Sequence, residues 1–181
     1  EQVLRVITQF VNPRYRFVCL ISAYSGLRLK NVVHLKRNEV NLKDGWLNIK
    51  SQSKTGKPVS IPIGPGLRKV FKLFKVWPLR DEDRFFPALK EKPISVQVGR
   101  AFKKAGISWG SFHHFRHFAA CELINNGVPL EVVREFLGHS DIKSTLVYAR
   151  LKGEKLQEAV SGFDTTLTQI EGQQFDWAVS D

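Results

Sequence analysis

The chain has 181 residues, of which 43% are hydrophobic and 25% are charged. This composition is that of a folded globular protein and excludes a largely disordered chain. The length suits one domain with a sizeable core. The formal net charge is +11, but residues 163–181 hold four acidic and no basic residues, so residues 1–162 carry +15, from 28 basic and 13 acidic side chains. A body this basic favours a polyanionic partner, and nucleic acid is the commonest.

The cysteines indicate the redox compartment, and the first residue indicates the extent of the chain. Cys19 and Cys121 each stand in an apolar run, which predicts buried free thiols in a reducing compartment and no disulfide framework. No signal peptide or membrane-spanning segment is visible in the sequence. The chain begins with Glu1 and contains no methionine, so we expect it to be part of a longer protein.

Apolar periodicity predicts three helices in the first 35 residues. Residues 1–11 place their apolar side chains on one helical stripe. Residues 14–25 are apolar nearly all round, as in a helix at the centre of a core. Gly26 ends this second helix, and residues 29–35 form the third.

The next segment changes from helical to strand patterning. Within residues 38–63, Asp44-Gly45 stands between two apolar runs and predicts a two-residue hairpin. Residues 59–63 alternate between apolar and polar side chains, as in a third strand. We therefore expect a small three-stranded antiparallel sheet.

Three basic residues occupy turns in this first part. Arg28 follows Gly26 at a tight turn between two helices, and Lys54 and Lys57 lie in a polar, glycine-containing turn before the third strand. From spacing alone, Arg28 is either a surface charge or a side chain aimed at a ligand. Lysines at a hairpin tip are usually solvated, so position alone assigns them no role.

The chain then returns to helical patterning. Residues 64–66 break the chain, residues 67–77 carry a helical apolar stripe, and residues 79–93 are a surface loop anchored by a buried aromatic pair. Residues 95–105 form another helix. The sequence thus predicts an α+β fold that is mainly helical.

The stretch from His113 to Tyr148 concentrates groups that can bind and attack a phosphate. His113 and Arg116 stand three residues apart at the start of a helix, so their side chains share one face and can reach one oxyanion. Gly138 is typical of a helix C-terminus and places His139 at a sharp corner. Tyr148 follows nine residues later. Arginine, histidine and tyrosine together indicate phosphoryl chemistry with a covalent step.

The histidines of this stretch do not favour a metal site. His113 and His117 share a helix face and His114 lies beside them, but Arg116 would repel a cation there. No acidic or cysteine ligand stands near them, as a zinc site of this kind needs. No glycine-rich phosphate loop is present either, which argues against an ATP-driven enzyme.

These residues, in this order, resemble the tyrosine recombinases, the family of phage-type integrases and their relatives. The catalytic domains of that family carry an arginine, a lysine, a His-x-x-Arg motif, a histidine or tryptophan, and a tyrosine. The matching residues are Arg28, Lys54, His113, Arg116, His139 and Tyr148. The resemblance covers residues 1–162, which implies a catalytic domain there and an acidic tail at 163–181. Two positions depart from the family pattern: Asn31 stands where the family usually has an acidic residue, and His114 stands where it commonly has Asp or another polar group.

The resemblance implies a mechanism without metal or cofactor. Tyr148 attacks the scissile phosphate and forms a 3′-phosphotyrosine link, which leaves a free 5′-hydroxyl. Arg28 and Arg116 neutralise the charge that develops on the non-bridging oxygens, and His139 adds a hydrogen bond. A 5′-hydroxyl from a second strand reverses the attack, and cleavage becomes strand exchange.

Proton transfer is assigned to two further residues by the same resemblance. His113 accepts the tyrosine proton, and Lys54 donates a proton to the leaving 5′-oxygen. Lys57, three residues later in the same turn, is the competitor for the lysine role.

The resemblance also implies partners and a setting. The expected partner is double-stranded DNA, bound by a homotetramer that is a monomer in solution, without membrane association, in the cytoplasm of a prokaryotic cell and encoded by a phage or mobile element. The tail at 163–181 docks on a neighbouring subunit or folds back on its own basic face. Two other functions stay open, a type IB topoisomerase-like nicking and resealing enzyme and a DNA-binding relative without turnover.

Overall fold

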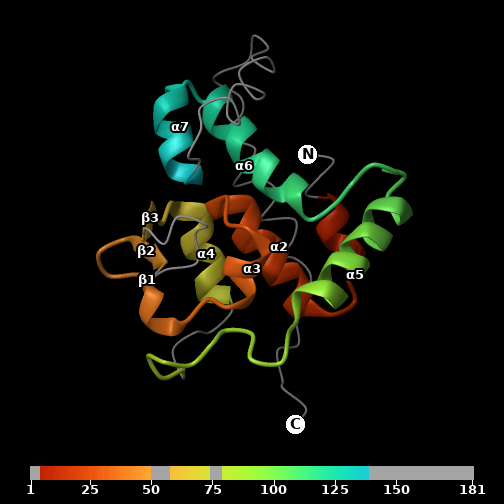
Figure 1. Ribbon diagram of the computed structural model, residues 1–181, viewed down its shortest axis with the longest axis horizontal. Helices are drawn as coiled ribbons and strands as arrows, with labels where there is room; N and C mark the ends of the chain where they lie inside the picture. Colours follow the sequence, from red (N-terminus) through yellow and green to blue (C-terminus); the bar gives the residue numbers. More distant parts are fainter. Residues whose placement is uncertain (1–4, 50–57, 74–78, 139–181) are drawn as a thin grey trace.

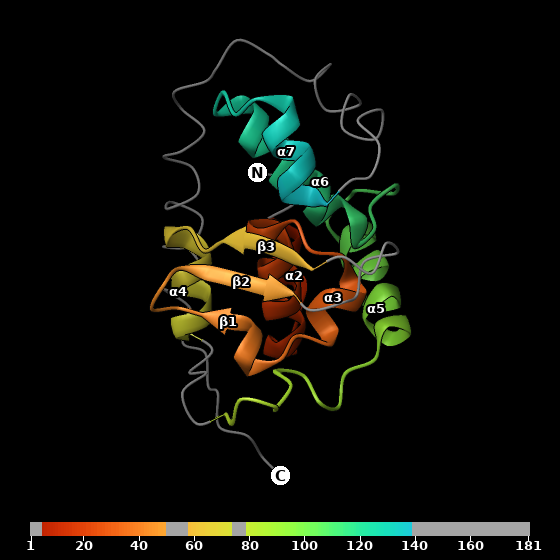
Figure 2. The same ribbon diagram turned by 60° about the vertical axis from the view of Figure 1, so that its left-hand side comes forward.

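The computed structural model describes residues 5–49, 58–73 and 79–138 (Figures 1 and 2). The described part is mainly helical with one three-stranded antiparallel sheet, so the predicted α+β class is confirmed. In chain order the elements are η1 (Val6–Gln9), α2 (Pro13–Ser25), α3 (Leu29–Val33), η2 (Arg37–Glu39), β1 (Val40–Asn41), β2 (Trp46–Ile49), β3 (Val59–Pro62), α4 (Pro65–Leu73), α5 (Glu91–Lys104), α6 (His113–Asn125) and α7 (Leu130–Leu137).

Helix α2 is the centre of the fold. It is buried nearly all round and packs against α3, α4, α6 and η1 (Figure 1), as its apolar sequence predicts. The side chain of Asn12 caps its start by accepting the Arg14 N–H at 2.9 Å, and Pro13 stands at its first turn. Gly26 ends the helix in the left-handed conformation with φ of 66°. The helix predicted for residues 14–25 is confirmed.

The segments on either side of α2 differ in how far they can be compared with the prediction. In the 1–11 segment, Arg5 is helical, the 3-10 turn η1 follows and buries Val6 and Ile7, and the backbone is extended at Phe10. Residues 1–4 lie outside the described part. Helix α3 ends at Val33, earlier than expected, yet Leu35 beyond it is fully buried. Leu35 therefore packs in the core without extending the helix.

The sheet has the order β1-β2-β3, and its first turn differs from the prediction. Asn41 pairs with Trp46, so four residues connect β1 to β2 and the predicted two-residue hairpin is wrong. The cause is Asn41: its side-chain oxygen accepts the Asp44 N–H at 3.0 Å, and its carbonyl accepts the Gly45 N–H at 2.9 Å. This Asx-type turn uses two more residues than the expected hairpin.

One face of the sheet packs on the core. Leu47 and Ile49 of β2 and Ile61 of β3 are buried in the same apolar cluster as α2, while Trp46 and Asn48 on the other face are exposed. Leu47 pairs with Ile61, and Ile49 pairs with Val59. The alternation predicted for residues 59–63 therefore sets which face of the sheet is buried.

Two helices in the middle of the chain begin earlier than predicted. Helix α4 begins at Pro65 and α5 at Glu91, four residues before the expected Ser95. Proline fits the first turn of a helix because its missing N–H would have no partner there. Pro93 is thus accommodated in α5. In the loop before α5, Phe85 and Phe86 are buried, which confirms the predicted anchor.

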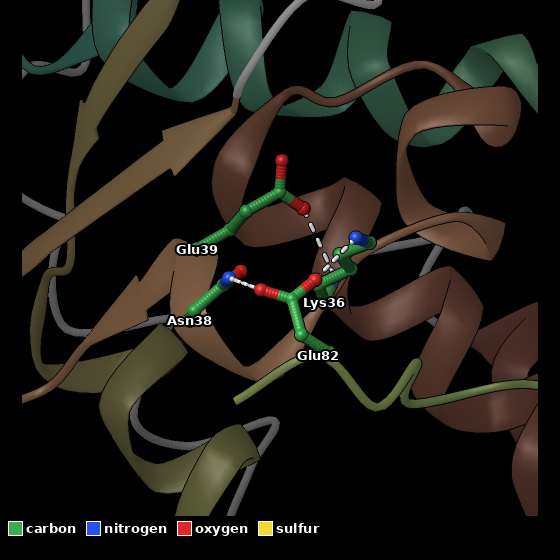
Figure 3. A network of polar contacts seen from close by, with 4 residues as sticks. All are labelled: Lys36, Asn38, Glu39 and Glu82. Carbon is green, nitrogen blue, oxygen red and sulfur yellow. Dashed lines mark hydrogen bonds and ion pairs between the residues drawn. The ribbon is translucent and has the colours of Figure 1, made fainter. Parts of the chain in front are cut away.

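This loop is also held by polar contacts with η2 (Figure 3). The Glu82 carboxylate contacts Lys36 Nζ at 2.6 Å and accepts a hydrogen bond from Asn38 at 2.9 Å. The Glu39 carboxylate accepts the Lys36 backbone N–H at 2.9 Å. The two contacts of Glu82 join segments more than 40 residues apart, but they are exposed and add little stability each, whereas the bond of Glu39 is local to η2.

Both cysteines are free thiols, as predicted, but only Cys19 is buried as expected. Cys19 is fully buried, and burial raises its pKa well above the usual value. Cys121 is half-buried, and its pKa is raised by burial and by the neighbouring Glu122. Among the described helices, none has the length and apolarity required to span a bilayer.

Candidate active site

Three of the six predicted catalytic residues belong to the described structure. Arg28, His113 and Arg116 are described, whereas Lys54, its competitor Lys57, His139 and Tyr148 lie outside the described residues. The described part of the candidate site consists of Arg28, His113 and Arg116 and of the ends of the elements around them.

Arg28 stands at a turn that buried serines hold in place. Ser22 Oγ donates to the Leu27 carbonyl at 2.8 Å, and Ser25 Oγ accepts the Leu27 N–H at 3.3 Å. Both serines are fully buried, so these bonds satisfy polar groups that would otherwise be costly. Gly26 supplies the left-handed turn, and Arg28 follows as the exposed N-cap residue of α3.

The two positions that depart from the family pattern are both integrated into the fold. Asn31 is buried on α3, one turn after Arg28. The Nδ1 atom of His114 accepts the Ser111 N–H at 3.0 Å, and its ring meets the edge of Trp109 with ring centroids 4.8 Å apart. His114 thereby fixes the loop that leads into α6.

Arg116 joins the C-terminal ends of two helices. It lies one turn after the exposed His113 on α6 and is only 2% exposed. Its Nη1 donates to the carbonyl of Gly26 at 2.6 Å, and its Nη2 donates to the carbonyl of Leu137 at 2.5 Å. Helix C-termini present carbonyls without helical partners and carry partial negative charge. A buried guanidinium therefore suits this position, because it satisfies both helix ends at once.

The two hydrogen bonds of Arg116 link the segments that precede Arg28 and His139. Gly26 lies two residues before Arg28, and Leu137 lies two residues before His139. A Cβ atom at Gly26 would stand 2.8 Å from Leu137 Cδ2, so α2 and α7 approach each other closely here. Gly138 ends α7 with φ of 61°, which confirms the predicted helix stop.

Strand β3 begins beside the same corner. Val59 Cγ2 lies 3.4 Å from the position that a Cβ atom at Gly138 would occupy, and α7 contacts β3. Figure 2 shows α7 above this strand. The strand that follows the lysine-containing turn thus begins next to the residue that precedes His139.

The electrostatic surroundings of His113 include both arginines. Its pKa is lowered, first by partial burial of the ring and then by the positive charges of Arg116, Arg28 and His114. An imidazole with a lowered pKa is neutral at pH 7 and can accept a proton. Arg28 and Arg116, 88 residues apart in the sequence, thus both disfavour a charge on this ring.

His117 contacts His113, although its sequence position had been weighed only for a metal site. The two ring centroids are 4.5 Å apart and the planes meet at 90°. The pKa of His117 is lowered to about 4, first by burial and then by the charges of His113, His114 and Arg116. Its i, i+4 spacing from His113 is the signal that could have indicated the contact. Within the described residues, no group of three or more His, Cys, Asp or Glu side chains is placed to hold a metal ion.

Comparison with known proteins gives matches over most of the chain. A tyrosine recombinase XerA of Pyrococcus furiosus is 29% identical over 154 residues, which cover 81% of this chain and 54% of the relative. The chain therefore spans about half the length of that relative.

Solved structures share the fold. The catalytic domain of bacteriophage HP1 integrase has a TM-score of 0.66 at 23% identity and covers 88% of this chain and 90% of its own. A structure of XerH site-specific recombinase bound to palindromic difH substrate has a TM-score of 0.67 at 22% identity, covering 90% and 51%. The model of the phage integrase family matches residues 1–155. The chain belongs to the phage integrase family.

Proposed function

We propose that this chain is the catalytic domain of a site-specific DNA recombinase that cleaves and rejoins DNA strands through a 3′-phosphotyrosine intermediate. The observation that carries the proposal is the pair of hydrogen bonds that Arg116 donates to the carbonyls of Gly26 and Leu137. These bonds support the proposal because Gly26 lies two residues before Arg28, Leu137 lies two residues before His139, and His113 lies one turn before Arg116. The DNA-bound XerH recombinase that shares the fold and the +15 charge of residues 1–162 support duplex DNA as the substrate.

The proposed first step is an in-line displacement at phosphorus. The phenolic oxygen of Tyr148 attacks the scissile phosphate, a Tyr148–phosphorus bond forms, and the bond from phosphorus to the 5′-oxygen breaks. The phosphate stays joined to the 3′ end of the cut strand, and a 5′-hydroxyl leaves. The second step is the reverse attack by a 5′-hydroxyl of the partner strand, so no external energy source is consumed.

Charge on the phosphate oxygens is stabilised by fixed cations. Arg28 and Arg116 oppose the negative charge that grows on the non-bridging oxygens, and His139 donates a hydrogen bond. The positive field of both arginines already reaches the site, since both lower the pKa of His113. Cations held in place before the reaction need no reorganisation in the transition state.

Two proton transfers accompany the displacement. His113 accepts the phenol proton of Tyr148, and its lowered pKa keeps the ring neutral for this role at pH 7. Lys54 donates a proton to the departing 5′-oxygen, with Lys57 as the rival. The charge balance therefore needs neither metal nor cofactor.

The proposal extends to the assembly and its setting. Residues 1–162 form the catalytic domain, and residues 163–181 form a tail that docks on a neighbouring subunit. The protein is a monomer in solution and a homotetramer on duplex DNA. We place it in the cytoplasm of a prokaryotic cell, encoded by a phage or another mobile element.

Trapping the covalent intermediate tests this function. The 181-residue chain is incubated with a pool of duplexes of varied sequence that carry a nick close to each candidate phosphate, so that the cleaved fragment diffuses away and the adduct persists. A protein–DNA band that survives denaturing electrophoresis is expected, and Tyr148→Phe should abolish it while duplex binding remains. An adduct at undiminished yield in this variant would move the nucleophile to Tyr15 or Tyr24. Duplex binding without any adduct would instead favour a DNA-binding relative without turnover.

A further inference from the structure

Three histidines crowd the start of α6. The ring centroids of His113 and His117 are 4.5 Å apart with perpendicular planes, and those of His114 and His117 are 5.4 Å apart. Residues four apart on a helix lie one above the other on the same face. His117 is half-buried, whereas His113 one turn before it is exposed.

Positive charge near this cluster disfavours the protonated form of His117. On α6, the groups that carry or can gain such a charge are Arg116, His113 and His114. From the start of α3, Arg28 acts on His113. Burial and these cations lower the pKa of His117 to about 4, so His117 is neutral wherever the protein is at work near pH 7.

We propose that His117 is a positioning residue, whose uncharged ring packs against the imidazole of His113, fixes the orientation of that imidazole and shields it from water. The inference rests on the proposed function in one respect, that His113 accepts the proton of Tyr148. A base must present its nitrogen in a narrow range of directions. The perpendicular ring contact restricts how His113 can turn.

Shielding has a second effect, on the protonation of His113. Partial burial is the first cause of its lowered pKa, because a charged imidazole loses hydration in such a place. Removal of the His117 ring opens this side of His113 to water. The pKa of His113 then rises toward its usual value, and a larger fraction of the base is already protonated near neutral pH.

Two variants of His117 separate ring packing from proton transfer. His117→Ala removes the ring, whereas His117→Phe keeps an aromatic ring of similar size that cannot carry a proton. If the ring acts by packing, the phenylalanine variant restores what the alanine variant loses. If His117 itself carries the proton, both variants lose function equally.

The first measurement is the titration of His113 followed by NMR of the imidazole C–H signals, with the signal assigned through a His113→Gln variant. The midpoint should rise in His117→Ala and stay near the wild-type value in His117→Phe. An unchanged midpoint in His117→Ala, or an equal rise in both variants, would overturn the proposal.

The second measurement is the pH dependence of adduct formation on the nicked duplexes. A base works only when unprotonated, so the rate falls as pH falls through the pKa of His113. His117→Ala should move this acidic limb to higher pH and lower the rate at pH 7 by on the order of 10-fold to 100-fold. His117→Phe should recover most of the rate. Equal loss in both variants would assign the proton to His117 and refute the positioning role.

Leu123→Ala is the matched control, because Leu123 is half-buried on the same helix and packs in a separate small apolar cluster. It should lower thermal stability and leave the acidic limb in place; a limb that moved as in His117→Ala would show a general effect of destabilisation and overturn the inference. Failure of the proposed function is recognised separately. If the wild-type chain forms no adduct while the His113 midpoint responds as expected, the ring contact stands and the catalytic assignment falls.

Discussion

The Nη1 atom of Arg116 donates to the carbonyl oxygen of Gly26 at 2.6 Å, across 90 residues of sequence. The Nη2 atom donates a second hydrogen bond, to the carbonyl of Leu137. Arg116 therefore links the turn that precedes Arg28 to the end of α7. Arg116 is buried while Arg28 is exposed. The two arginines that the family pattern treats alike therefore differ in what they do for the fold.

Arginine substitutions should separate these two roles. Arg116→Ala leaves two buried carbonyls without their donors, so the free energy of unfolding should fall by about 2–4 kcal/mol. Arg28→Ala should leave it nearly unchanged. Chemical denaturation of both variants measures the difference, and Arg116→Lys, which retains the charge but cannot span both carbonyls, should remain destabilised. Equal stability of the two alanine variants would show that the two hydrogen bonds of Arg116 do not stabilise the fold.

Cleavage should respond differently from stability. Each alanine variant should lower the rate of adduct formation by on the order of 10² or more, the scale for loss of one fixed charge-stabilising donor. Duplex binding should weaken far less, because the basic surface spreads its affinity over many phosphates. Equal losses of cleavage and binding would show that the arginines contribute to DNA binding and not to stabilisation of the transition state.

A glycine pair tests the close approach of α2 and α7. Gly26→Ala forces a Cβ into the left-handed conformation and places it 2.8 Å from Leu137 Cδ2, so we expect a loss of about 1–3 kcal/mol in unfolding free energy. Gly99→Ala is the matched control, because it lies inside α5 with no atom within 4 Å of its Cβ position. It should stabilise by about 0.5–1 kcal/mol. Adduct formation should fall only in Gly26→Ala.

Lys54 and Lys57, in the turn before β3, can be distinguished by a substrate that needs no proton donor. A 5′-bridging phosphorothiolate has a leaving group that departs unprotonated, so a variant that lacks the general acid should recover cleavage on it. We expect rescue of Lys54→Ala and none of Lys57→Ala, measured as the ratio of cleavage rates on the sulfur and oxygen substrates. The opposite pattern would assign the role to Lys57.

Local signals in the sequence were sufficient for the helices that build the site. The continuous apolar run of α2, the stop at Gly26 and the stop at Gly138 follow from periodicity and from the left-handed preference of glycine. The family resemblance supplied the functional residues. Of these, Arg28, His113 and Arg116 belong to the described structure, where the charges of both arginines lower the pKa of His113.

Contacts between distant segments could not be predicted in this way. Nothing in the local pattern shows that Arg116 would donate to backbone carbonyls 90 and 21 residues away. The error in the predicted hairpin has a similar origin. Asp44-Gly45 is a strong signal for a two-residue turn, but the hydrogen bond from the Asp44 N–H to the side chain of Asn41 stabilises a four-residue connection instead. Tertiary placement and side-chain hydrogen bonds decide such cases, not propensity.

The acidic tail combines negative charge with large apolar side chains. Residues 163–181 carry a charge of −4 next to a body of +15. They also contain four large apolar residues, Leu167, Ile170, Phe175 and Trp177. A tail with these groups is too apolar for a purely solvated extension. Docking on a neighbouring subunit and masking of the basic face are the two explanations.

Deletion of residues 163–181 separates the two explanations. Docking between subunits predicts that assembly on DNA and recombination are lost while the affinity of one chain for duplex DNA is retained. Masking predicts tighter duplex binding, because an internal polyanion no longer competes with phosphate. Native gels for assembly and titration at fixed salt for affinity measure both quantities. A second pair of variants identifies the chemistry: neutralising the four acids should reproduce the deletion if the tail masks, and changing the four apolar residues to serine should reproduce it if the tail docks. If neither assembly nor affinity changes on deletion, the tail is a passive extension and both explanations are wrong.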